Sequence, residues 1–171
     1  FVGKEVMCNL QSDVPIEKLT TESEVYVTNY YLKGFSFSSY SLTDIDIEWI
    51  EKNFNQISAL DDEAYNTALH CLSTYRWHTI PRARLAILWA GIEGLFKIDS
   101  EITFRISLYI AYFLEPDNQL KRRQIFNDVK KLYRIRSRAV HGGKVSIDTS
   151  DAVDQSASLL LKLVRRCAEV G

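Results

Sequence analysis

The chain has 171 residues, of which 46% are hydrophobic and 25% charged, and its net charge is −1. This length and composition predict one soluble globular domain with its own core, and seven glycines and three prolines exclude collagen-like and low-complexity chains. The longest apolar stretch, residues 85–92, is too short for a membrane span and no signal peptide is visible, so we expect a cytoplasmic protein without membrane contact.

Residues 1–40 do not have the pattern of a helix. Residues 24–28 and 34–38 alternate in the manner of strands, which predicts either a β-hairpin or the trailing edge of a preceding domain. No catalytic group is recognised there. The start at Phe1 rather than Met favours a module within a larger protein that has further domains.

Two helices are expected next. The first has Thr43 as its N-cap and an apolar stripe formed by Ile47, Ile50, Phe54 and Ile57. The second opens at residues 61–63, and its inner face is expected to hold Tyr65, Leu69 and Leu72. It ends before Pro81, because proline disfavours helical geometry in the residue that precedes it.

The third helix is predicted from residue 81 to about residue 97. Its stripe consists of Leu85, Leu88, Trp89, Ile92 and Phe96. Gly91 and Gly94 lower its helix propensity, so we expect a neighbouring helix to approach closely there.

A fourth helix, near residues 101–114, has an expected inner face of Ile102, Ile106, Tyr109, Ile110 and Phe113. A fifth follows over residues 118–141. Residues 149–151 then cap a last helix, whose expected core residues are Val153, Leu160, Leu163 and Val164. The predicted fold class is all-α: an antiparallel bundle of about five to six helices over residues 41–171, after a non-helical or β-hairpin segment over residues 1–40.

One face of the fifth helix is apolar except for a single arginine. It consists of Ile125, Val129, Leu132, Arg136 and Val140. A guanidinium stays charged, so an arginine that faces the core needs a carboxylate, a bound anion or a subunit interface. His141 follows five residues later, and Gly142-Gly143 favours a left-handed helix end.

These residues also carry a family resemblance. Arg136-Ser137-x-x-x-His141 resembles the Arg-x4–6-His signature of HEPN domains. The surrounding Leu132–Gly142 block and the upstream Leu88-Trp89-Ala90-Gly91-Ile92-Glu93-Gly94-Leu95-Phe96 resemble the ApeA-like branch of that family, and the resemblance covers roughly residues 41–171.

The resemblance implies a dimeric, metal-independent endoribonuclease of a prokaryotic defence or toxin-like system, with no cofactor. In such enzymes a 2′-hydroxyl attacks the adjacent phosphate and leaves a 2′,3′-cyclic phosphate. By this resemblance His141 is the general acid or base and Arg136 clamps the phosphate. Ser137 orients the phosphate and Glu93 orients Arg136, within ion-pair reach.

Structural roles are the alternatives for the same residues. Arg136 then forms a structural ion pair, His141 caps a helix, Ser137 bonds to a carbonyl of its own helix, and Glu93 is a surface carboxylate. For the whole chain, the alternatives are a non-catalytic HEPN module that dimerises and binds nucleic acid or a nucleotide, and a purely structural bundle.

Charge is unevenly distributed along the chain. Residues 1–80 hold 5 basic and 12 acidic side chains, whereas residues 81–144 hold 13 basic and 6 acidic. Lys130, Arg134 and Arg138 are spaced four residues apart, which predicts either an RNA-binding ridge or a solvated helix face. The three cysteines, Cys8, Cys71 and Cys167, are far apart in sequence and predict neither a disulfide framework nor a metal site.

Overall fold

The computed structural model describes residues 6–12, 14–32, 43–98, 100–141 and 149–170, and the chain divides into two units, residues 1–42 and 43–171. In the first unit β1 (Val6–Ser12) pairs antiparallel with β2 (Val25–Leu32), and a 3₁₀ turn (Ile16–Lys18) lies between them. β2 includes one predicted strand. β1, which was not predicted, pairs with it, and the second predicted strand, residues 34–38, lies outside the described residues.

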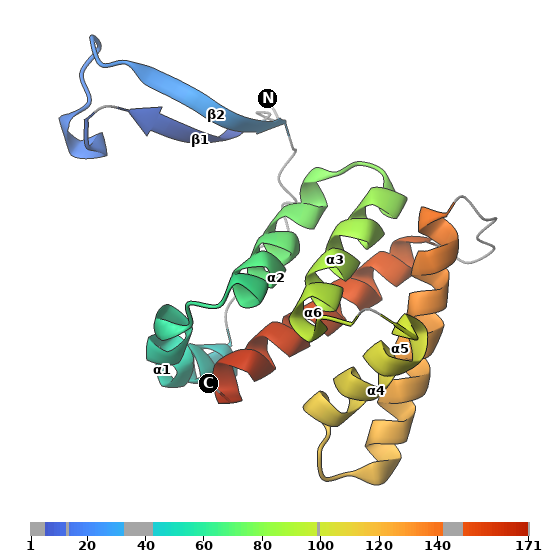
Figure 1. The fold of residues 1–171 in the computed structure, drawn as a ribbon. Helices are drawn as coiled ribbons and strands as arrows, with labels where there is room; N and C mark the ends of the chain where they lie inside the picture. Colours follow the sequence, from blue (N-terminus) through green and yellow to red (C-terminus); the bar gives the residue numbers. More distant parts are fainter. Residues whose placement is uncertain (1–5, 13, 33–42, 99, 142–148, 171) are drawn as a thin grey trace. The chain divides into compact units, whose positions relative to one another are not determined.

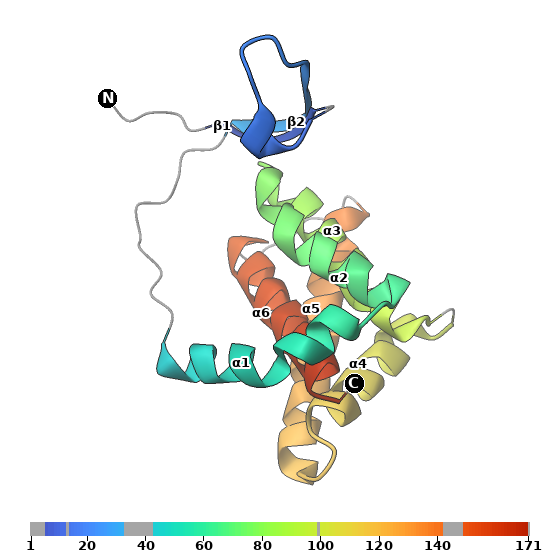
Figure 2. The ribbon, with the colours of Figure 1, turned by 90° about the vertical axis from the view of Figure 1, so that its left-hand side faces the viewer.

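The described part of the second unit is helical, and the predicted all-α class is confirmed (Figure 1). Its helices are α1 (Asp44–Ala59), α2 (Glu63–Thr74), α3 (Pro81–Phe96), α4 (Ile102–Leu114), α5 (Gln119–Val140) and α6 (Thr149–Val170). α2 and α3 form one antiparallel pair, α4 and α5 form another, and α6 packs against all five other helices (Figures 1 and 2). None of the described helices is both long and apolar enough to cross a membrane.

Side-chain caps begin several of these helices, and the predicted Thr43 cap is confirmed. The Thr43 hydroxyl accepts from the Asp46 amide while the Asp46 carboxylate accepts from the Thr43 amide, which is a reciprocal capping box. Asp62 and Asn118 cap α2 and α5 through one bond each, in which the side-chain oxygen accepts from the amide three residues later. Pro81 is the first residue of α3, where its missing N–H costs no helical hydrogen bond.

Trp89 lies at the centre of the core and joins three helices. Its side chain is fully buried, and its ring meets Tyr133 of α5 edge-to-face with centroids 5.1 Å apart. Its Nε1–H donates to Ser156 Oγ of α6 at 3.1 Å, and that hydroxyl donates to the Ala152 carbonyl at 2.7 Å. Around it lie further fully buried side chains: Leu85, Leu88, Ile92, Ile106, Ile110, Leu160 and Leu163.

The apolar stripe predicted for α1 faces outward within its unit. Three of its four side chains are 41–61% exposed, namely Ile47, Ile50 and Phe54. A different face is fixed against α6, because Trp49 Nε1–H donates to Glu169 at 3.0 Å and the Arg165 guanidinium stacks on the Trp49 ring at 4.5 Å. The contacts of Trp49 with Glu169 and Arg165 therefore determine which face of α1 packs on α6. The face predicted from the hydrophobic pattern was wrong.

Smaller corrections concern other predicted core positions. Tyr109 on α4 is 43% exposed, and Val140 is 41% exposed at the last residue of α5. The buried face of α5 continues through Ala139, which is 1% exposed, because Ala139 lies seven residues after the buried Leu132, close to two full turns, whereas Val140 lies one residue past them. Leu69 and Leu72 on α2 are half-buried at the edge of the core.

The two glycines of α3 differ in their surroundings. A Cβ on Gly91 would lie 2.9 Å from Cys71 Cβ, 3.2 Å from Leu160 Cδ2 and 3.3 Å from Ala68 Cα. The close approach predicted at Gly91 is confirmed. A Cβ on Gly94 would have no neighbour within 4 Å, so the same prediction is wrong there.

This contrast gives a paired stability prediction. We expect Gly94→Ala to stabilise the fold by about 0.5–1 kcal/mol, since alanine is the better helix former and gains no clash. We expect Gly91→Ala to destabilise it by about 1–3 kcal/mol, because α2 must move away to admit the methyl group. Urea unfolding of both variants measures the difference, and two variants that shift stability in the same direction would contradict it.

Candidate functional site

An ion pair joins α3 to α5 at the edge of the core. Arg136 Nη2 lies 3.1 Å from Glu93 Oε1, and its hydrogen bond is directed at Oε2 at 3.5 Å. The side chains are 17% and 29% exposed, so both are largely withdrawn from water. The packing of α3 on α5 brings residues 43 positions apart into contact. The predicted pairing of Arg136 with Glu93 is therefore confirmed.

The Arg136 guanidinium is held by an aromatic ring as well as by the carboxylate. Its Cζ lies 5.5 Å from the centroid of Tyr133, the ring that meets Trp89 edge-to-face. Arg136 Nε and Glu93 Oε1 are buried and have no hydrogen-bond partner within the described parts of the chain. Oε1 is nevertheless compensated by the ion pair, so Arg136 Nε is the buried donor of the pair that has no partner in the described chain.

Burial governs the protonation of the carboxylate. Desolvation raises the pKa of Glu93, and the opposing attraction of Arg136 does not cancel it. Burial also raises the pKa of the Tyr133 hydroxyl, and the Glu93 charge adds to that shift. The folded chain therefore retains a proton on Glu93 to a higher pH than the unfolded chain does.

We expect the raised pKa of Glu93 to make the free energy of unfolding depend on pH. Above the ordinary carboxyl value of 4.5 the folded state binds more protons than the unfolded state, so the contribution of Glu93 falls as pH rises through the window between the two pKa values. The unfolding free energy of wild type minus that of Glu93→Gln should therefore decrease from pH 4 upward and then level off.

Urea titrations of both proteins across this range measure the difference. The same difference taken in an Arg136→Gln background should fall more steeply, because the group that lowers the pKa is gone. A difference that rises with pH would mean that the attraction of Arg136 outweighs burial.

His141 is exposed at the C-terminal end of α5. Its backbone N–H donates to the Ser137 carbonyl at 3.1 Å, and φ −88° with ψ 16° ends the helix there. Among the described residues its imidazole has no hydrogen bond or ion pair, and the Ser137 hydroxyl has none either. Five residues rotate a helical side chain by about 140° and advance it by about 7.5 Å, so His141 and Arg136 diverge within one chain.

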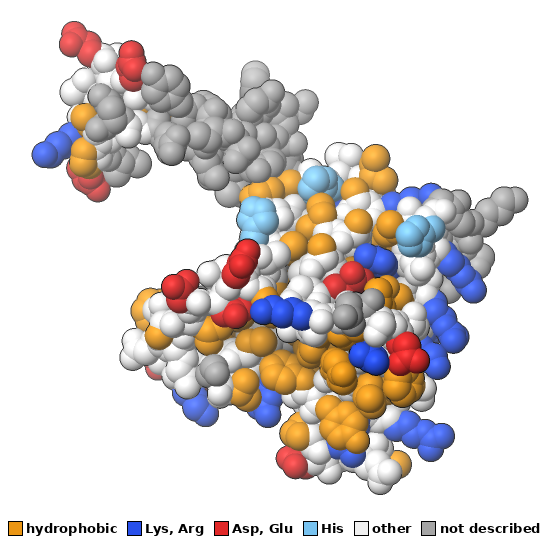
Figure 3. Space-filling view, viewed as in Figure 1, with side chains coloured by type: hydrophobic (Ala, Val, Ile, Leu, Met, Phe, Trp, Pro, Cys, Tyr) orange, Lys and Arg blue, Asp and Glu red, His pale blue; other side chains and the backbone are white. Residues whose placement is uncertain are grey.

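α5 is strongly basic. It contains one acidic residue, Asp128, and the basic residues Lys121, Arg122, Arg123, Lys130, Lys131, Arg134, Arg136 and Arg138. Arg134 and Arg138 are exposed, whereas Lys130 is half-buried with its Nζ 5.5 Å from the centroid of Phe126. Figure 3 shows Lys and Arg side chains along the edge formed by α5. The predicted ridge therefore reaches solvent, and an aromatic ring that the charge pattern did not indicate lies beside Lys130.

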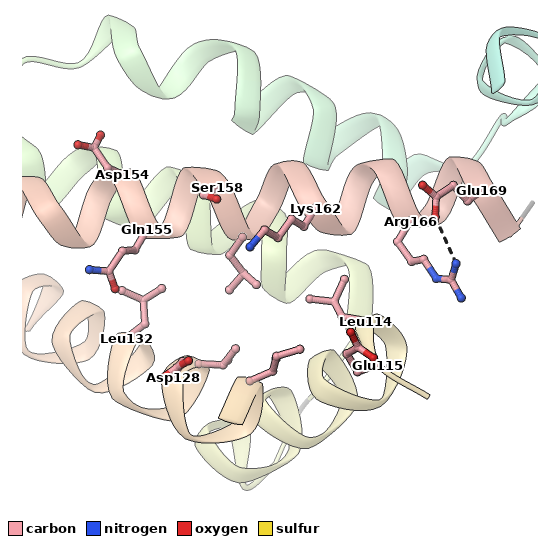
Figure 4. Close-up of a pocket in the computed structure, with 13 residues that line it drawn as sticks. Leu114, Glu115, Asp128, Leu132, Asp154, Gln155, Ser158, Lys162, Arg166 and Glu169 are labelled. Carbon is pink, nitrogen blue, oxygen red and sulfur yellow. Dashed lines mark hydrogen bonds and ion pairs between the residues drawn. The ribbon is translucent and has the colours of Figure 1, made fainter. Parts of the chain in front are cut away.

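A groove of about 710 Å³ lies between α5 and α6, beside the end of α4 (Figure 4). Leu114, Ile125, Val129, Leu132 and Leu159 form its apolar part. Its charged groups are four carboxylates and two cations, namely Glu115, Asp128, Asp154, Glu169, Lys162 and Arg166. Arg166 is paired with Glu169 at 3.2 Å. The excess of carboxylates repels phosphate, so this groove does not suit an RNA backbone.

Comparison with known proteins adds no functional assignment. No family model, curated protein or solved structure matches the chain. The Glu93–Arg136 pair, the exposed His141 and the basic α5 are therefore the features from which function is inferred.

Proposed function

We propose that this chain is a HEPN-type, metal-independent endoribonuclease that acts as a homodimer in the cytoplasm, in prokaryotic defence or toxin-like systems. The observation that supports the proposal is the Glu93–Arg136 ion pair. It joins the two sequence blocks that resemble the family, and it holds the guanidinium in the low-dielectric edge of the core. A fixed guanidinium in such a place stabilises the charge of a phosphorane more strongly than one in bulk water.

In the proposed reaction, His141 removes the proton from a ribose 2′-hydroxyl. The 2′-oxygen then bonds to the adjacent phosphorus while Arg136 holds the nonbridging oxygens. The bond to the 5′-oxygen breaks, and that oxygen takes a proton from an imidazolium. The products are a 2′,3′-cyclic phosphate and a 5′-hydroxyl end. Ser137, which lies between the two residues in sequence, contributes a hydroxyl to the phosphate.

Two considerations support a dimer. Each chain supplies one motif histidine, whereas the reaction needs both a base and an acid. Arg136 and His141 also diverge along α5, so side chains from two copies can converge on one phosphate where those of a single copy do not. A two-fold interface that brings two α5 ends together would provide both histidines.

The test is incubation of the purified dimer with RNA in EDTA, followed by analysis of the product ends. Cyclic phosphate ends are expected, and cleavage that requires a divalent cation would contradict the mechanism. The second candidate is the non-catalytic binding module. The exposed ridge of α5 favours it, because such a ridge binds phosphates whether or not they are cleaved. Binding of RNA by a dimer that leaves it intact would select this second function.

A further inference from the structure

The surface formed by α4 and α5 carries aromatic rings in contact with the basic ridge. Phe104 and Tyr112 on α4 are 51% and 53% exposed, although large aromatic side chains are normally buried. Phe104 meets Phe126 of α5 with centroids 5.7 Å apart at 73°. Tyr112 lies beneath the Arg122 guanidinium, whose Cζ is 4.3 Å from the ring centroid. We call Phe104, Tyr112 and Phe126, with Arg122 and Lys130, the aromatic–basic surface.

These contacts follow one ridge of α5. Arg122, Phe126, Lys130, Arg134 and Arg138 are spaced four residues apart, which is the spacing of a continuous ridge along a helix. The ridge is about 24 Å long, at 1.5 Å per residue. Cations and a ring alternate at its start, cations alone continue it, and His141 stands at the end of the same helix.

We propose that the aromatic–basic surface binds single-stranded RNA, with unpaired bases stacked on Phe104 and Tyr112 and the phosphates along the ridge toward His141. Stacking needs an exposed ring and a base with a free face, and charge attraction needs cations beside it. Both are present within one surface. A duplex lacks free base faces, so a single strand is the occupant that uses both features. The inference rests on the proposed function, because the bound strand is the substrate of that reaction.

Charge decides against a second copy of the chain on this surface. In a two-fold interface formed by this surface the same patch meets itself, so Arg122 and Lys130 of one copy would face Arg122 and Lys130 of the other. Asp128 is the one acidic residue within α4 and α5, and it lines the groove toward α6. Glu101 and Glu115, which flank α4, are paired with Arg105 and Lys121 and form no ion pair with Arg122 or Lys130 among the described residues. Like charges placed against each other cost association free energy, whereas a polyanion removes the repulsion.

The probe is a fluorescent 2′-O-methyl oligouridine of about 12 nucleotides, within the range of known single-strand site sizes. It has no free 2′-hydroxyl, so it cannot be cleaved by the proposed reaction. We expect Phe104→Ala and Tyr112→Ala each to weaken binding by about 5- to 150-fold, which corresponds to the loss of one base–aromatic stack of ~1–3 kcal/mol. Tyr112→Phe keeps the ring and should retain affinity.

The matched control is Phe54→Ala, which removes an exposed ring from α1 and should leave affinity unchanged. Salt dependence separates stacking from charge. Removal of a ring should preserve the slope of log affinity against log salt, whereas Arg134→Ala should reduce that slope by about 0.7, the value for one phosphate contact on a single strand.

Several results would overturn the proposal: unchanged affinity in both ring variants, an equal loss in Phe54→Ala, or equal binding of the same strand in a duplex. Absence of binding by wild type, or dissociation of a dimer by Phe104→Ala, would do so too. Cleavage reports separately on the proposed function. Ring-dependent binding without cleavage would refute the nuclease and keep the surface, whereas cleavage with ring-independent binding would refute the surface alone.

Discussion

His141→Ala should lose RNA cleavage by about 10²–10⁴-fold, the usual effect of removing a positioned general acid–base group. Histidine suits this task because its ordinary pKa lies near neutral pH. The imidazole is exposed at the end of α5 and has no hydrogen bond or ion pair among the described residues, so its removal leaves no buried group without a partner. The loss should therefore appear in the rate and not in the unfolding free energy.

The measurement compares initial cleavage rates of wild type and His141→Ala in EDTA near pH 7.5, with urea unfolding of the same samples. His70→Ala is the matched control, because His70 is a second exposed histidine, on α2, outside the motif. It should cleave at the wild-type rate. If His141→Ala cleaves as fast as His70→Ala, the motif histidine has no part in the chemistry.

Much of the fold follows from local sequence signals. The first turns of α1, α2, α3 and α5 begin at capping residues or at Pro81, because the start of a helix is determined by hydrogen bonds within a few residues. The buried residues of α6 were also predictable, because apolar residues at helical spacing lie on one face of a regular helix. The pairing of β2 with β1 could not be predicted from the sequence, because alternation identifies a strand but not the strand with which it pairs.

Contacts that depend on two distant segments were harder to predict. The outward rotation of α1 depends on Trp49 meeting Glu169, and neither residue indicates the other in sequence. For the Glu93–Arg136 pair, the apolar face around Arg136 predicted only that the guanidinium needs a carboxylate, an anion or a subunit interface, and the family resemblance supplied Glu93 as the partner. The aromatic–basic surface was not, since Phe104 and Tyr112 are typical core residues by type, and their exposure depends on where α4 meets α5.

The second large effect is expected in stability. Trp89→Ala should lower the free energy of unfolding by about 3–5 kcal/mol, as large-to-alanine changes do at fully buried sites. The ring is 0% exposed and contacts both Tyr133 and Ser156, so its loss opens a cavity where α3, α5 and α6 meet. Small domains are stable by only about 5–15 kcal/mol, so this one change removes a large part of the total.

Two milder variants divide this loss into packing and hydrogen bonding. Ser156→Ala should cost about 1–3 kcal/mol, because it leaves the buried Trp89 N–H without its acceptor. Trp89→Phe should cost less than Trp89→Ala, since most of the ring volume remains and Ser156 still donates to Ala152. Urea unfolding of the three variants gives the order, and a Trp89→Ala loss no larger than that of Ser156→Ala would mean that the core closes around the missing ring. Trp89 lies one turn before Glu93 on α3, so the same cavity should also loosen the carboxylate that holds Arg136.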